Sequence, residues 1–177
     1  MSGALQRAMR PMLQRLQLMI GRAVVLLVND GSKLQGLQVS LLADEVRDQV
    51  ERFQNYGFTS HPLPGAEAVA ASVAGNRDHV LVIAVDDRRY RLTALQQGEV
   101  AIYTDEGDKI VIKRGGTIEV TAATKVVLDT PLVQCTGDVT VAGTVTAGVD
   151  VVADGISLVG HRHGGVDTGV GNTGVPV

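Results

Sequence analysis

The sequence of 177 residues has few aromatic side chains: they make up 3% of the chain, tryptophan is absent, and nothing aromatic follows Tyr103. Aromatic residues bring the largest buried area per side chain. A segment without them must bury many small side chains in a narrow space or share its core with partners. The aromatic residues that are present all lie in the first part of the chain: Phe53, Tyr56, Phe58, Tyr90 and Tyr103. We therefore expect the two parts of the chain to be built differently.

Other absences exclude whole classes of protein. The net charge is −3, and neither Lys nor Arg occurs between Lys125 and Arg162, which argues against nucleic-acid binding. The single cysteine, Cys135, excludes an intramolecular disulfide framework, and its place in an alternating apolar segment predicts a buried, inert thiol. No apolar run approaches the roughly 20 residues of a membrane helix. The first residues also lack the apolar core of a signal peptide, so conventional secretion is not expected.

Residues 1–21 have apolar side chains at close to helical spacing, several arginines and no acid. This pattern predicts a short amphipathic helix, interrupted at Pro11. We expect the helix to dock on a partner or on the next domain of the same chain. Binding to a membrane surface is the alternative for a basic amphipathic stretch.

Short strand patterns follow, with turn chemistry at Asn29–Ser32 and an extended loop rich in proline and glycine at 57–67. The patterns span residues 23–28, 34–41, 69–73, 79–85 and 88–95. Residues 44–52 mix acids and bases and indicate a solvated face between partly buried valines. About five short strands of this kind predict a small closed barrel or a sandwich.

The pattern changes beyond residue 97. Residues 100–103, 110–112 and 118–120 predict successive hairpins, and from 131 to 160 small apolar residues recur at every second position. Strands this thin would expose open edges if they stood alone. A solenoid or an intertwined trimer would provide neighbours, and only the trimer explains the loss of aromatic residues, because a narrow axis has no room for them.

Two histidines, His161 and His163, lie where this alternating segment ends in a glycine-rich stretch. In an extended backbone, side chains at i and i+2 point the same way, with Arg162 turned outward. Two imidazoles are too few for a structural metal site, but three chains on a three-fold axis would offer six nitrogens, which suits iron or nickel better than tetrahedral zinc. The alternative for a His-x-His in such a segment is a solvated turn.

Several segments resemble the Mu-like phage baseplate central spike family of contractile tails. The similar segments are Tyr56-Gly57-Phe58-Thr59-Ser60, Pro62, Pro64-Gly65-Ala66-Glu67, Arg88-Arg89-Tyr90-Arg91-Leu92, Gly98-Glu99 and Asp105-Glu106-Gly107. The resemblance implies a mainly β fold in which an OB-fold-like barrel precedes an intertwined trimeric β-helix with a small metal-binding apex. The expected parts are an N-terminal helix at 1–21, the barrel at 22–96, the β-helix at 97–159 and the apex at 160–177.

The resemblance also implies ligands and a function. His161 and His163 match the family's His-x-His motif, so an iron ion, one per trimer on the three-fold axis, is expected there. Calcium and chloride are possible along the axis; Asp150 and Asp154 are nearby carboxylates but match no motif. The implied function is structural: a homotrimeric needle of the virion baseplate that binds hub and tail tube proteins and pierces the host outer membrane.

Three alternatives to the spike fit the sequence less well. A six-residue spacing of Cys135, Val141, Ala147, Ala153 and Val159 is similar to that of hexapeptide acyltransferases, but period-two alternation explains the same residues. A hydrolase would need a nucleophile, a base and an orienting group close together. The sequence spacing does not predict such a cluster among the candidates Ser60, His61, His79, Asp86 and Asp87. A carbohydrate-binding tail fibre would usually display aromatic residues for sugar stacking, and this chain has none after Tyr103. We therefore expect no enzymatic activity.

Overall fold

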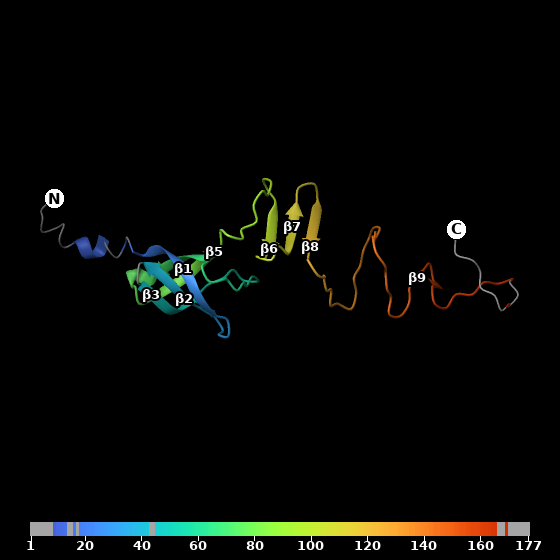
Figure 1. The fold of residues 1–177 in the computed structure, drawn as a ribbon, viewed down its shortest axis with the longest axis horizontal. Coiled ribbons are helices and arrows are strands. Elements are labelled where there is room, and N and C mark those ends of the chain that lie inside the picture. The colour runs from blue at the N-terminus through green and yellow to red at the C-terminus, as the bar shows by residue number, and fades with distance from the viewer. Residues whose placement is uncertain (1–8, 14–15, 17, 43–44, 166–168, 170–177) are drawn as a thin grey trace. The chain divides into compact units, whose positions relative to one another are not determined.

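The structure is a computed structural model that describes residues 9–13, 16, 18–42, 45–165 and 169. The chain divides into two compact units, Met1–Val126 and Val127–Val177 (Figure 1). Residues 9–13 and Leu16 are helical and exposed. The helix predicted over 1–21 is wrong at its end, because residues 18–19 form a turn and a bend and β1 begins at Ile20. The other residues of the predicted helix lie outside the described residues. Among the described residues, no helix has the length and apolar character needed to cross a membrane.

Five strands close into a barrel in the order β1-β2-β3-β5-β4. The strands are β1 (Ile20–Asn29), β2 (Gln35–Leu42), β3 (Glu45–Arg52), β4 (Glu67–Ser72) and β5 (Val80–Asp86). β1 pairs antiparallel with both β2 and β4, which closes the barrel, whereas β3 and β5 run parallel. A mainly β chain with a closed five-stranded barrel is thereby confirmed.

The barrel is filled by alanine, valine and leucine. Strand alternation turns Ala23 and Val25 of β1 and Leu37 and Val39 of β2 inward, and all four are buried. Val82 of β5 is also fully buried. A barrel of five short strands has a narrow interior that such side chains fill without any aromatic residue.

β3 ends in a buried arginine, Arg52, whereas the mixed acids and bases of residues 44–52 had indicated a solvated face. Arg52 is only 8% exposed, and its Nη1 donates to Gln35 Oε1 and to the Ser60 carbonyl, both at 2.8 Å. Its Nη2 donates to Ser60 Oγ at 2.9 Å, and Gln35 Nε2 donates to Asp30 Oδ1 at 2.6 Å. Burial lowers the pKa of Arg52, and the negative charge of Asp30 partly opposes this. The network ties the loop after β3 to the barrel.

Replacing Arg52 by methionine should destabilise the barrel by about 2–3 kcal/mol, because buried acceptors of Gln35 and Ser60 lose their donors. Denaturant titration of the full-length protein, followed by tyrosine fluorescence, would measure the change. Arg88→Met is the control, because the exposed Arg88–Glu67 ion pair should contribute at most about 1 kcal/mol. Equal effects of the two substitutions would contradict a structural role for the buried network.

The strand predicted at 88–95 is wrong. The Asp87 carbonyl accepts the backbone N–H of Tyr90 and of Arg91, which makes a turn, and Ala94 has a positive φ of 63°. The Asp87 carboxylate accepts Arg89 Nε at 2.8 Å, and this side-chain hydrogen bond is the largest cause of the lowered pKa of Asp87. Local hydrogen bonds to an aspartate therefore override the strand propensity.

Arg89 also contacts the Pro64-Gly65 pair in the loop before β4. Its Nη2 donates to the Pro64 carbonyl at 2.9 Å, and a Cβ on Gly65 would lie 3.0 Å from Nη1. Gly65 has φ +90° as well. The backbone conformation at this position requires glycine, and a side chain there would also press against the flexible end of Arg89.

Three further strands, β6 (Val100–Tyr103), β7 (Lys109–Lys113) and β8 (Thr117–Thr121), form an antiparallel sheet. The hairpins predicted here are confirmed. The pairings Val100↔Ile112↔Ile118 and Ile102↔Ile110↔Val120 place six apolar side chains on one face of the sheet. Each is between 43% and 66% exposed, so this apolar face has no cover within the described chain.

The second unit has little local structure before its end. Residues 127–149, all of which are described, form no strand, and their side chains are exposed. Cys135, predicted to be buried, is exposed in the single chain. The only strands in the described part of this unit are β9 (Val152–Ala153) and β10 (Ile156–Ser157). The alternating pattern therefore does not produce strand pairing within one chain.

Candidate metal centre

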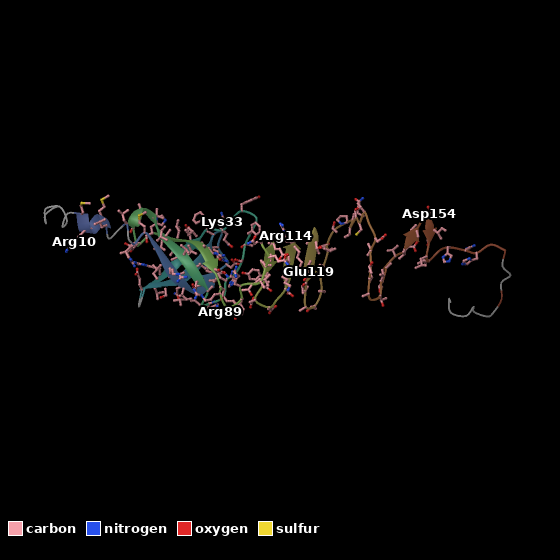
Figure 2. All side chains as sticks on the ribbon, turned by 90° about the horizontal axis from the view of Figure 1, so that it is seen from above. Arg10, Lys33, Arg89, Arg114, Glu119 and Asp154 are labelled. Carbon is pink, nitrogen blue, oxygen red and sulfur yellow. The ribbon has the colours of Figure 1, made fainter. Side chains whose placement is uncertain are left out.

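β9 and β10 pair as a two-residue hairpin, with Ile156 opposite Ala153. Asp154 and Gly155 form its turn with φ values of 49° and 76°, and Figure 2 labels Asp154 there. Positive φ at both central residues is typical of a type I′ turn, for which Asp-Gly is a preferred pair. Asp154 is thus accounted for as a turn residue.

Asp150 lies immediately before this hairpin. Its Oδ1 accepts the backbone N–H of Val151 at 2.8 Å and of Val159 at 3.2 Å. The side chain of Ser157 is the largest cause of the lowered pKa of Asp150. The carboxylate is therefore already engaged by its own chain.

The two predicted metal ligands lie next to each other after a turn at residues 158–160. The ring centroids of His161 and His163 are 5.1 Å apart and the ring planes are 80° from parallel. His161 Nδ1 lies 3.0 Å from the Ser157 carbonyl oxygen and 3.1 Å from that of Leu158. Because both neighbours are acceptors, Nδ1 carries the proton, and the lone pair of the neutral ring is on Nε2.

One chain does not complete a metal site. In the described part of the chain, no group of three or more His, Cys, Asp or Glu side chains has a metal-binding arrangement. Both imidazoles are exposed, and Asp150 is held by its own hairpin. Two adjacent imidazoles, one with its tautomer fixed by backbone carbonyls, are a donor set that fits a divalent transition metal once further ligands come from elsewhere.

Comparison with known proteins covers nearly the whole chain. Family models match at residues 22–89 (Bacteriophage Mu Gp45, N-terminal), 116–155 (Phage spike trimer) and 155–177 (GpV Apex motif). The baseplate puncturing device gp45 of Escherichia phage Mu is 43% identical, over 97% of this chain and 95% of that protein. The Mu-like prophage FluMu protein gp45 of Haemophilus influenzae is 38% identical, over 90% of this chain and 94% of that protein.

The barrel and these matches define a structural spike protein of a phage tail. Such a protein is part of the virion, in the baseplate of the tail. The chain belongs to the Mu gp45 family of baseplate spike proteins. The resemblance inferred from the sequence motifs is thereby confirmed, and the matches favour a spike over a tail fibre or an acyltransferase. By name, the phage Mu relative is a baseplate puncturing device and the matching family model is a phage spike.

Proposed function

We propose that three copies of this chain form a needle at the centre of the baseplate that pierces the host outer membrane during infection. The observation that carries the proposal is the uncovered apolar face of the β6–β8 sheet. A soluble monomer rarely leaves a contiguous apolar face of this kind open. Three such faces packed around one axis would bury one another.

The segment 127–149 supports the same assembly. It keeps the alternating pattern of strands, yet it forms no strand pairing with the described residues of its own chain. Winding three chains together would give each backbone a neighbour on both sides and would leave no free edge. A match to a family described as a spike trimer over residues 116–155 supports three as the number of chains. A β-helix shaft at 97–159, between a barrel at 22–96 and an apex at 160–177, is the arrangement we propose.

The apex would hold one iron ion on the three-fold axis. His161 and His163 of each chain would supply six nitrogens, a set that suits an octahedral ion such as iron. When bound, the ion would cross-link the three C-terminal segments. Calcium and chloride on the axis remain predictions; the Asp150 carboxylate is held by its own chain, and Asp154 is in the hairpin turn.

The partners follow from this geometry. The barrel and the segment that precedes it would fix the needle to hub and tail tube proteins, and the apex would meet the host outer membrane first. We expect no binding of nucleic acid, because the net charge of −3 would repel its phosphates. The needle would have a mechanical role, without enzymatic activity.

Light scattering on the purified full-length protein should give three times the mass of one chain. Elemental analysis should find about one iron ion per three chains. A monomeric mass would overturn the needle, because the apolar face would then be open in the active form. A trimer without a transition metal would leave the needle standing and remove the metal site.

A further inference from the structure

One carboxylate, that of Asp150, accepts hydrogen bonds from both ends of the hairpin that precedes the histidines. Asp150 Oδ1 accepts the N–H of Val151, just before β9, and that of Val159, just after β10. The Leu158 N–H donates to the Val151 carbonyl at 2.8 Å and extends the hairpin by one further bond. The chain leaving β10 therefore has a defined path.

Ser157 connects this hairpin to the first histidine. Its Oγ accepts the N–H of Gly160 at 2.7 Å, and its carbonyl accepts the N–H of His161 at 3.1 Å. The same carbonyl lies 3.0 Å from His161 Nδ1. A Cβ at Gly160 would lie 3.1 Å from Ser157 Oγ. Glycine at this position therefore leaves room for the hydrogen bond between its N–H and the Ser157 hydroxyl.

The charge on Asp150 fits this role. Its pKa is lowered first by the Ser157 side chain and further by the backbone N–H groups of Val159, Val151 and Leu158, against the opposing effect of desolvation. All of these donors come from the hairpin and its turn. The ionised carboxylate thus stabilises one conformation of residues 150–160.

We propose that Asp150 and Ser157 are positioning residues for the His161 imidazole. By closing the hairpin and its turn, they hold Nδ1 against the carbonyls of Ser157 and Leu158 and present Nε2 as the metal-binding nitrogen. Groups that orient a metal-ligating histidine in this way typically change metal affinity by about 10- to 100-fold when removed. The inference rests on the proposed metal site, but the orientation itself is a property of the metal-free protein.

The test compares Asp150→Ala, Asp150→Asn and Asp138→Ala in the full-length protein. Asparagine keeps an acceptor oxygen for the two N–H groups, and Asp138 is an exposed carboxylate of the same unit, outside the hairpin. Nitrogen-15 NMR of labelled histidine in the metal-free protein reports the His161 tautomer, and titration with Fe²⁺ reports affinity. Ser157→Ala, with Ser157→Thr as its conservative partner, provides a second pair should Asp150→Ala fail to fold.

We expect Asp150→Ala and Ser157→Ala to lose the Nδ1–H preference and to bind Fe²⁺ about 10- to 100-fold more weakly. Asp150→Asn, Ser157→Thr and Asp138→Ala should keep the wild-type tautomer. The proposal is overturned if Asp150→Ala and Ser157→Ala keep the tautomer and affinity of Asp138→Ala, or if Asp150→Asn and Ser157→Thr lose them as fully as the alanine variants. Absence of Fe²⁺ binding by the wild type would instead remove the metal site, and the tautomers would still decide the positioning role.

Discussion

Replacing Ile112 by aspartate should abolish the trimer. Ile112 is central to the apolar face of the β6–β8 sheet, between Val100 and Ile118, and is 52% exposed in the single chain. Three-fold packing would bring three carboxylates together in an apolar interior without partners. An unpaired buried charge costs about 3–5 kcal/mol, so three of them should outweigh the association free energy. Light scattering should show monomers or aggregates in place of a trimer.

The matched control is Thr117→Asp. Thr117 pairs with Lys113 on the opposite face of the same sheet and is exposed. A carboxylate there would sit beside a lysine and outside the proposed axis, so the trimer should persist. A normal trimer from Ile112→Asp would place this face on the outside of the assembly and contradict the proposed packing.

Changing both His161 and His163 to alanine should remove the transition metal completely. All six proposed ligand nitrogens disappear together, and the Asp150 carboxylate is held by its own hairpin. Elemental analysis should fall from about one ion per three chains to none. The trimer itself should remain, because the apolar face and the alternating segment are unchanged.

The chain provides its own control in the two other histidines. His61 and His79 lie in the first unit, and the double variant His61→Ala with His79→Ala should keep the metal. Iron that persists in the His161 and His163 variant, or that is lost from the His61 and His79 variant, would put the ion elsewhere in the molecule.

Local patterns predicted most of the first unit. The apolar run around Val25, the alternation around Val39 and the turn between them indicated the first hairpin. β3 was not predicted as a strand, because the mixed acids and bases of residues 44–52 indicated a solvated face. Its C-terminal end is nevertheless buried in the barrel. The partners of Arg52 are Gln35 and Ser60, and only the folded barrel brings them together.

The apex was predicted less completely. The spacing of His161 and His163 predicted that the rings would lie together, and they do. The engagement of Asp150 was not predicted, because it depends on a contact with Val159 across a hairpin. Asp154-Gly155 between alternating residues was a signal for that hairpin. Metal binding and three-fold assembly stay predictions, since both depend on more than one copy of the chain.

The lack of strand pairing at residues 127–149 has a consequence for how the virus makes its particle. In the proposed assembly, a newly synthesised copy would have to meet two others before this segment gained any protection, and such an encounter slows steeply as the protein becomes dilute. Until then the exposed segment would be open to proteases of the infected cell. The yield of finished tails should therefore depend on how much of this protein the cell makes and on its local concentration during synthesis.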